Sequence, residues 1–229
     1  MKLGIVIPWR QQPSRLEAFH ATVEDISDTF PDASIYFSDT ESERFNPSAS
    51  RNRGCRFAIK DGCDVLLVMD ADMLLEGWAI ENSIRVASDL GIVSLPYLLL
   101  NRLNENLSTS LLNKETSADE IRRSGIGNPG QSQIGGAYVL SSSTFLKLNG
   151  WDERFVGWGY EDNAFEVAHE VLLGRKFHRS AGHAITLHHL DRDQESLEEN
   201  RQRFYGYTGK SKAEMLEIVS GNMVEGTNE

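Results

Sequence analysis

The sequence is poor in cysteine, in positive charge and in long apolar segments, and each shortage excludes a class of protein. The two cysteines, Cys55 and Cys63, fit neither a redox CxxC motif nor a zinc cage, and reduced thiols in a cytoplasmic protein are the simplest interpretation. Lys and Arg number 23 against 34 Asp and Glu, so we expect no binding to a nucleic-acid backbone. No apolar segment has the length of a signal peptide or a transmembrane helix, and we expect a cytoplasmic protein without a membrane span.

The order of the predicted elements favours an α/β fold. Short apolar strands alternate with helices through the first hundred residues, which is typical of a mostly parallel central sheet flanked by helices. We expect strands over 3–7, 33–39, 64–70 and 91–100, and helices over 16–26, 48–60 and 78–90. Ser14 is the expected cap of the first helix, with Glu17 at the capping-box position. The continuously apolar run at 64–70 predicts a central strand that is covered on both faces.

The second half of the chain has a weaker pattern. Residues 101–133 are polar and lack a clear period, so we expect a long loop that serves as a lid or is disordered. Strands over 134–140 and 184–190 and helices over 142–148 and 162–173 follow. The sequence therefore predicts a single domain over 1–193 and a polar, partly helical C-terminal tail over 194–229.

The segment VMDADM places Asp70 and Asp72 directly after the most hydrophobic predicted strand. Ligands of open α/β sheets bind beyond the carboxyl ends of the strands, and alternation puts both carboxylates on one side. Two such carboxylates repel each other unless a cation lies near them, and their hard oxygen atoms suit Mg²⁺ or Mn²⁺. An ordinary Asp-containing turn is the alternative, and these residues alone leave both interpretations open.

The segment IPWRQQ leaves the first predicted strand at the same edge of the sheet. Trp9 could cover a nucleotide base, and the Arg10 guanidinium could contact a phosphate. A buried tryptophan beside a surface arginine is the simpler interpretation of these residues taken alone.

Four of the six histidines lie between His178 and His189. Side chains alternate along a strand, so only one of His188 and His189 can point toward a metal that is bound near Asp72. Metal ligation is the favoured interpretation for this pair, whereas His178 and His183 are expected to be structural.

The segment GWGYEDNAF puts Trp158 between two glycines and places Glu161 and Asp162 at the start of a predicted helix. Gly157 and Gly159 could act as hinges, and an indole can lie flat on the C–H face of a sugar. The positive end of the helix dipole should lower the pKa of both carboxylates. Further upstream, Gly135 and Gly136 open a strand and would let the backbone approach a ligand closely. Taken alone, the two acids could serve only the helix terminus.

Taken together and in this order, these segments resemble the β-1,4-galactosyltransferase family and related family 2-like transferases of GT-A fold. The resemblance covers most of 1–193 and rests on four stretches: IVIPWRQQPSRLEAF, FNPSASRNRGCRFAIKDGCDVLLVMDADMLL, IGGAYVLSSSTFLKLNGWDERFVGWGYEDN and LHHLDRD. It implies a GT-A type nucleotide-sugar-binding fold. It also implies a metal-dependent, inverting transferase that moves a hexose from a nucleoside-diphosphate sugar, expected to be a UDP-sugar, to a hydroxyl of a carbohydrate or another acceptor.

The resemblance also implies a role for each matching residue. Asp72 would bind Mn²⁺ (or Mg²⁺) directly, and Asp70 would lie near the ribose or the metal. His189 or His188 would be a further metal ligand, and Pro8 and Arg10 would lie at the nucleotide. Gly136 and Trp158 would line the junction of donor and acceptor, Asp162 would be the catalytic base, and Glu161 would bind the acceptor sugar.

The sequence departs from the family in three respects. We expect no membrane anchor or stem of the kind that the family carries, Thr186 stands where some members have a methionine ligand, and Tyr160 stands where a second glycine is common.

Three other classes of protein share some of these features. A haloacid-dehalogenase-like phosphatase also uses D-x-D after a strand, although Met73 follows the motif here. A sugar-phosphate nucleotidyltransferase would need a glycine-rich basic loop, and PWRQQPSR has no glycine. A non-catalytic carbohydrate-binding protein could use Trp158 and the acids without a metal.

Overall fold

Ten strands form two sheets in the computed structural model, which describes residues 1–40, 42–124, 128–131, 134–188 and 195–223. The larger sheet has six strands in the order β2-β1-β3-β8-β5-β9, and the smaller has four in the order β4-β10-β6-β7. The larger sheet comprises β1 (Leu3–Pro8), β2 (Ser34–Ser38), β3 (Val65–Met69), β5 (Ser94–Leu95), β8 (Ala137–Ser141) and β9 (His178–Arg179). The smaller comprises β4 (Met73–Leu74), β6 (Leu99–Arg102), β7 (Asn128–Gln131) and β10 (His183–Thr186).

The larger sheet is mixed. β1 runs parallel to β2 and to β3, and β5 runs parallel to β9, whereas β8 is antiparallel to both of its neighbours. The expected parallel sheet is therefore present in its first half, and β8 reverses the direction. Because Met69 at the end of β3 pairs with Ala137 at the start of β8, the carboxyl end of β3 and the start of β8 lie at the same edge of the sheet. That edge carries the site described below.

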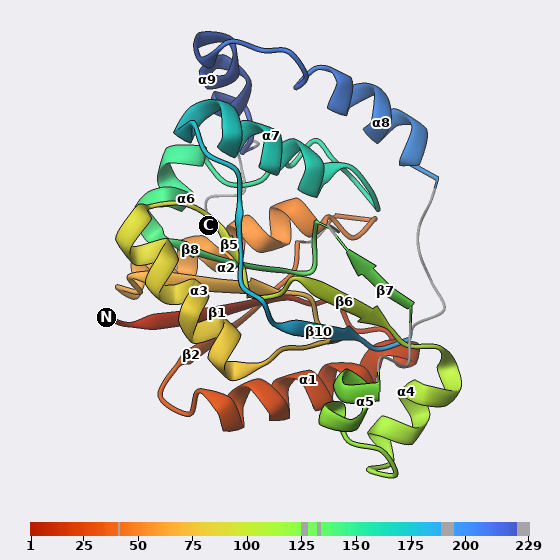
Figure 1. The fold of residues 1–229 in the computed structure, drawn as a ribbon. Coiled ribbons are helices and arrows are strands. Elements are labelled where there is room, and N and C mark those ends of the chain that lie inside the picture. Colours follow the sequence, from red (N-terminus) through yellow and green to blue (C-terminus); the bar gives the residue numbers. More distant parts are fainter. Residues whose placement is uncertain (41, 125–127, 132–133, 189–194, 224–229) are drawn as a thin grey trace.

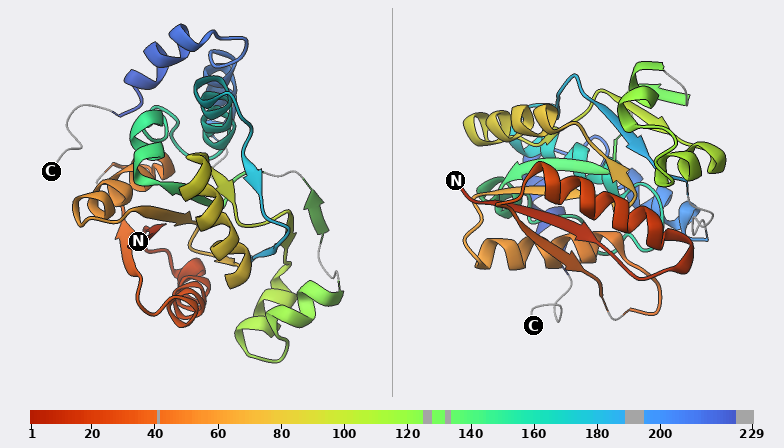
Figure 2. Two further views of the ribbon diagram at one scale, coloured as in Figure 1. Left: turned by 60° about the vertical axis from the view of Figure 1, so that its left-hand side comes forward. Right: turned by 90° about the horizontal axis from the view of Figure 1, so that it is seen from below.

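Helices cover both faces of the larger sheet (Figures 1 and 2). α2 packs on β1, β2 and β3, whereas α3 lies on the opposite face against β3, β5 and β8. The helical segments are η1 (Pro13–Arg15), α1 (Leu16–Thr29), α2 (Pro47–Lys60), α3 (Gly77–Leu90), α4 (Glu105–Leu112), α5 (Ala118–Ser124), α6 (Ser142–Leu148), α7 (Glu161–Leu173), α8 (Leu197–Tyr205) and α9 (Lys212–Ser220). None of the helices in the described part of the chain has the length and apolar character required to span a bilayer.

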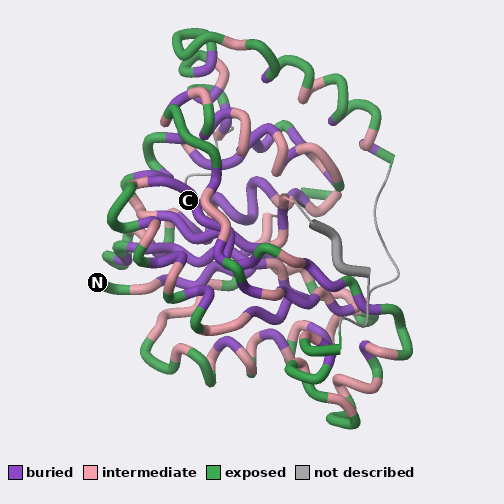
Figure 3. Tube along the Cα trace, in the orientation of Figure 1, coloured by how far each residue is buried: buried purple, intermediate pink, exposed green. Residues whose placement is uncertain are grey.

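The core is built around β3, as its apolar sequence predicts. All five residues of β3 are buried, because β1 and β8 flank the strand and helices cover both of its faces. Figure 3 shows this buried centre and the exposed outer turns of the helices around it. Trp151 and Phe165 add stacked rings 4.1 Å apart, and both contact Tyr138 edge-on.

Two local predictions from the sequence were wrong. Ser14 does not cap α1, because Pro13 starts a short 3-10 helix that holds Ser14 and passes directly into α1 at Leu16. The expected strand over 91–100 is divided into β5 and β6, which belong to different sheets. Pro96 lies between them, and proline has no N–H group to continue a ladder.

The prediction of an irregular loop was also wrong for much of 101–133. The segment holds α4, α5 and β7, and Asn104 caps α4 by accepting a hydrogen bond from the Leu107 N–H at 2.9 Å. Buried Ile121 of α5 packs in a second, smaller core with Leu103 and Ile185. Short helices with local caps leave little apolar period, which is why the sequence pattern did not show them.

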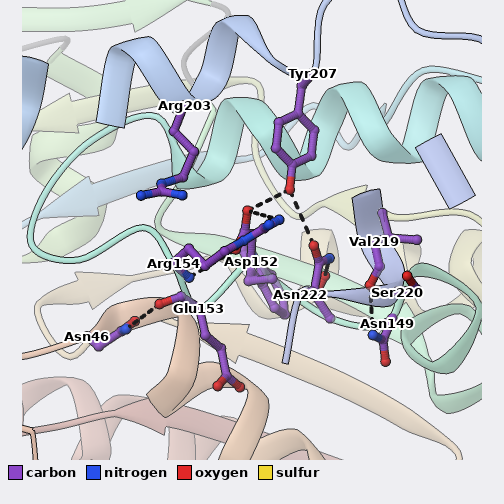
Figure 4. Close-up of polar contacts among 12 residues, drawn as sticks. Asn46, Asn149, Asp152, Glu153, Arg154, Arg203, Tyr207, Val219, Ser220 and Asn222 are labelled. Atoms are coloured by element: carbon purple, nitrogen blue, oxygen red, sulfur yellow. Dashed lines mark hydrogen bonds and ion pairs between the residues drawn. The ribbon is translucent and has the colours of Figure 1, made fainter. Parts of the chain in front are cut away.

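The helices of the C-terminal segment pack against the domain through buried polar contacts (Figure 4). The Tyr207 hydroxyl donates to Asp152 Oδ2 at 2.8 Å and lies 3.3 Å from Asn222 Oδ1. Arg154 holds the same Asp152 carboxylate at 2.7 and 2.8 Å. Met215 and Val219 of α9 are buried in the main core.

Candidate active site

A cavity of about 600 Å³ lies at the edge of the sheet where β1 and β3 end and β8 begins. It is lined by eight of the residues to which the family resemblance assigns a role: Pro8, Arg10, Asp70, Asp72, Gly136, Trp158, Glu161 and Asp162. The two acidic pairs, which are about 90 residues apart in the chain, therefore share one cavity.

Asp70 and Asp72 lie in the turn between β3 and β4. The Asp70 N–H donates to the Gly136 carbonyl at 2.7 Å, and the Asp72 carbonyl accepts from the Leu187 N–H at 2.8 Å. These main-chain bonds attach the turn to the start of β8 and to the end of β10. Burial raises the pKa of Asp70; Arg51 lowers it, and the carboxylates of Asp72 and Asp162 raise it further. A cation bound beside this pair would relieve that repulsion.

Glu161 and Asp162 begin α7, as the sequence predicts. Glu161 Oε2 accepts the Gly159 N–H at 3.1 Å, and its side chain is only 7% exposed. Burial and then the Asp162 carboxylate raise the pKa of Glu161 to about 8, against the opposing effect of Arg51. The prediction that the helix dipole lowers this pKa was wrong for Glu161, because the cost of burying a charge exceeds the effect of the dipole.

Arg51 of α2 connects the two acidic pairs from beneath the cavity. Its Nη1 donates to Asp162 Oδ1 at 2.9 Å and lies 3.6 Å from Glu161 Oε1, while Nη2 donates to Asp70 Oδ1 at 3.1 Å. The side chain of Arg51 is 4% exposed. One buried guanidinium thus faces three carboxylates, with Asp72 close to Asp70.

Of the two glycines that precede β8, Gly135 makes room for Asp162 and Gly136 packs closely against Met73. Gly135 and Gly136 have φ angles of 116° and 83°, and a Cβ on Gly135 would overlap with Asp162 Oδ2. The sequence suggested that these glycines let the backbone approach a ligand; both line the cavity, and Gly135 in addition leaves room for the carboxylate of Asp162. Tyr138 of β8 is fully buried, and burial and then the charge of the Asp162 carboxylate raise the pKa of its phenol.

The loop of Gly157 to Tyr160 forms another wall of the cavity and rests on α8. Trp158 is 40% exposed and lines the cavity. Asn200 of α8 donates from Nδ2 to the carbonyls of Val156 and Trp158 at 3.0 and 3.4 Å. Tyr160 has a φ angle of 68°, which glycine adopts most easily, and its ring stacks on Phe204 of α8 at 5.5 Å. This conformation explains why glycine suits the position occupied here by Tyr160.

The segment after β1 is held by its own neighbours. The Trp9 ring stacks on Phe19 of α1 at 4.1 Å, and Pro8 ends the strand at the cavity. Arg10 binds Asp39 through Nε at 2.7 Å and Nη2 at 3.0 Å, and also donates to the Thr40 carbonyl. The Arg10 guanidinium therefore fixes the loop after β2 while its side chain lines the cavity.

The structure describes three of the four histidines between positions 178 and 189. His178 Nδ1 forms a hydrogen bond with Ser94 Oγ at 2.8 Å, and the main-chain N–H of His183 donates to the Glu76 carboxylate. The main-chain N–H of His188 donates to Ser108 Oγ at 2.7 Å. His188 directly follows Leu187, whose N–H binds the Asp72 carbonyl, so the histidine pair follows a residue attached to the D-x-D turn. His189 lies outside the described residues.

The oxygen atoms at the D-x-D turn are compatible with a divalent cation. The described part of the chain holds only some of the ligands that such an ion would need. Within that part, no three His, Cys, Asp or Glu side chains form a group that could hold a metal. The cavity is lined by four carboxyl groups and by five arginines, of which buried Arg51 faces three of the carboxyl groups. The carboxylates of Asp70 and Asp72 supply hard oxygen ligands of the kind that suit Mn²⁺ or Mg²⁺.

Sequence reasoning missed Arg51, Tyr138 and Leu197 as parts of the site. Leu197 of α8 lines the cavity, and a Cβ on Gly159 would lie 2.7 Å from its Cδ1. Arg51 carried a usable signal, because positions 51, 55 and 58 follow the period of a buried helix face. A charged residue on such a face needs a buried partner. Tyr138 and Leu197 carried no comparable signal.

Comparison with known proteins agrees with this architecture. Residues 117–189 match the family model described as the N-terminal domain of galactosyltransferase, a segment that includes Gly136, Trp158, Glu161 and Asp162 but not the D-x-D turn. No protein in the curated collection matches the chain.

Two solved structures share the fold. One is a mutant of Drosophila β-1,4-galactosyltransferase 7 in complex with manganese, UDP-Gal and xylobiose, with a TM-score of 0.59 and 18% identity over 87% of this chain and 79% of that one. The other is the catalytic domain of the same enzyme with xylobiose, with a TM-score of 0.57 and 18% identity over 92% of this chain and 82% of that one. The chain therefore shares the GT-A type fold of these galactosyltransferases, and residues 117–189 resemble the galactosyltransferase family model.

Proposed function

We propose that this protein is a metal-dependent, inverting glycosyltransferase that moves a sugar from a UDP-sugar to an acceptor hydroxyl. One observation carries the proposal: the carboxylates after β3 and those at the start of α7 line the same cavity. A transferase needs the groups that hold the donor beside the group that activates the acceptor, because the donor diphosphate and the attacking hydroxyl must meet at one anomeric carbon.

The donor side would be formed by the D-x-D turn. Asp72, with Asp70 and one of His188 and His189, would hold Mn²⁺ or Mg²⁺, and the related fly enzyme has been solved with manganese and UDP-Gal. When bound, such an ion neutralises charge on a leaving diphosphate. Pro8 and Arg10 lie on the cavity wall where the nucleotide would extend.

The acceptor side would be formed by α7 and the loop before it. Asp162 would accept the proton of the attacking hydroxyl, and a general base of this kind contributes about 10²–10⁴-fold. The Arg51 guanidinium donates to Asp162 Oδ1 at 2.9 Å and so fixes the position of this carboxylate at the cavity. A single displacement by the hydroxyl inverts the anomeric configuration, by the geometric argument used for glycosidases.

Trp158 and Leu197 supply the apolar part of the acceptor wall. The indole offers a flat surface for a sugar ring, and Gly136 lies between the two sides, where donor and acceptor would meet. The Glu161 side chain is largely buried, so only the small part of it that lines the cavity could contact an acceptor. The buried, unpaired thiols of Cys55 and Cys63 fit the cytoplasmic location that we also propose.

A thermal-shift panel tests donor and metal together. The purified protein is heated with UDP-, GDP- and dTDP-sugars, each with and without Mn²⁺, and we expect stabilisation by UDP-sugars only when Mn²⁺ is present. Release of UDP from UDP-galactose, with xylobiose as an acceptor probe, then tests catalysis. Stabilisation by glycans alone, without donor turnover, would indicate a carbohydrate-binding protein. Mg²⁺-dependent cleavage of an aryl phosphate would indicate a phosphatase.

A further inference from the structure

Arg51 has the surroundings of a residue that serves the site rather than the core alone. Its side chain is 4% exposed, although arginine is almost never fully buried unless it is paired. The guanidinium lies 5.9 Å from the ring centroid of Tyr138 and 5.7 Å from that of Trp151. Aromatic faces on one side and carboxylates on the other restrict the position and the plane of the group.

The two ends of the guanidinium bind carboxylates that belong to different halves of the site. Nη2 binds Asp70, on the D-x-D turn, and Nη1 binds Asp162, at the start of α7. These partners are 19 and 111 residues away in the sequence. Because the guanidinium is planar and rigid, the two hydrogen bonds determine how far apart the two carboxylates lie.

That separation matters in a transfer reaction. The donor would be held on the side of Asp70, and the acceptor hydroxyl would be deprotonated by Asp162. Reacting atoms must approach to about 3–3.5 Å, and a misplacement of about 1 Å can cost on the order of 100-fold in rate. A lysine at position 51 would keep the positive charge, but its single ammonium group cannot reproduce the fork that spans both carboxylates.

We propose that Arg51 is a positioning residue that sets the spacing between the donor-side carboxylate Asp70 and the base Asp162. This inference rests on the proposed glycosyltransferase function. Arg51 would act through these two carboxylates, so its loss should slow turnover much more than it weakens donor binding.

The test compares Arg51→Lys with Arg53→Lys, a matched control on the same helix. Arg53 donates to the Asp39 carbonyl and lies over Phe57, so it contacts neither acidic pair. Each variant is checked for folding by its thermal midpoint. Mn²⁺-dependent binding of UDP is measured by calorimetry, and UDP release from UDP-galactose gives kcat and KM.

For Arg51→Lys we expect a fall in kcat of about 100-fold, with KM and UDP affinity within about threefold of the wild type. Arg53→Lys should retain both constants. The inference is overturned if Arg51→Lys turns over at the wild-type rate, or if kcat, KM and UDP affinity worsen by the same factor. A wild-type protein that releases no UDP from any donor would instead refute the proposed function.

A second variant covers the case in which Arg51→Lys does not fold. Glu161→Gln replaces one of the three carboxyl groups that face Arg51 by a neutral side chain that cannot ionise, so the double variant Arg51→Lys with Glu161→Gln keeps only Asp70 and Asp162 as charged partners of the lysine. Its kcat is compared with that of Glu161→Gln alone, and the same fall of about 100-fold is expected. Equal rates in these two proteins would contradict the positioning role.

Discussion

Glu161→Gln should make the metal-free protein more stable at neutral and alkaline pH. The Glu161 side chain is 7% exposed, and burial with the neighbouring Asp162 raises its pKa from 4.5 to about 8. Below pH 4.5 the carboxyl is protonated in the folded and in the unfolded chain. Between pH 4.5 and 8 the unfolded chain releases the proton while the folded chain keeps it, so wild-type stability falls as pH rises. Glutamine has no proton to release and avoids this loss.

The size of the effect follows from the two pKa values. One pKa unit corresponds to about 1.4 kcal/mol, so the difference between 4.5 and 8 gives an upper limit of about 5 kcal/mol. Asp162 and Arg51 share the interaction, and we therefore expect a gain on the order of 2 kcal/mol at pH 8. For a chain of this length that corresponds to a rise of about 4–8 °C in the thermal midpoint.

The assay is thermal and urea denaturation in EDTA at pH 5, 6, 7, 8 and 9. Glu170→Gln is the matched control, because Glu170 is exposed on the same helix and its replacement should change stability by less than about 0.5 kcal/mol. The advantage of Glu161→Gln should grow steadily with pH and level off above pH 8. A variant that is less stable than the wild type at pH 8, or whose advantage does not change with pH, would show that Glu161 is ionised in the folded protein.

Four further changes test other parts of the structure. Asp162→Asn should lower UDP release by about 10²–10⁴-fold while Mn²⁺-dependent UDP binding persists in calorimetry, and equal loss of both would refute the assignment of the base. Asp72→Ala should lose Mn²⁺-dependent UDP binding, and normal binding would place the metal elsewhere. Asn52→Ala should cost about 2–4 kcal/mol in urea denaturation, because buried Asn52 binds the main chain of Trp151 at 2.7 and 2.9 Å and Glu153 Oε1 at 3.0 Å; a loss below about 1 kcal/mol would contradict this. Tyr207→Phe should cost about 1–2 kcal/mol in the same assay, since buried Asp152 loses one donor, and an unchanged midpoint would show that the bond contributes nothing.

The sequence predicts best the elements whose side chains alternate or repeat strongly. The strands at β1, β2 and β3 and the helices α2, α3, α6 and α7 are where the apolar pattern places them. β3 was the clearest case, because a strand covered on both faces needs apolar residues at every position.

The failures occur where a local signal is weak or is overridden. α4 and α5 are short and are capped by their own polar side chains, so they resemble a loop in sequence. Pro96 divides one apolar run between two sheets, which composition alone does not reveal. Glu161 keeps a raised pKa at a helix start, because burial depends on the residues that fold over it.

The candidate site likewise combines features that the sequence predicts with features that only the folded structure shows. The sequence by itself determined which chemical groups are present: two acids after the central strand, a Gly-Trp-Gly segment, and two acids at the start of a helix. The tertiary structure alone decided that Arg51 joins the two acidic pairs and that α8 supports the loop of Trp158. Hydrogen bonds between residues 19, 42 and 111 positions apart leave no periodic trace in the chain, because they depend on how the elements pack and not on the residues next to them.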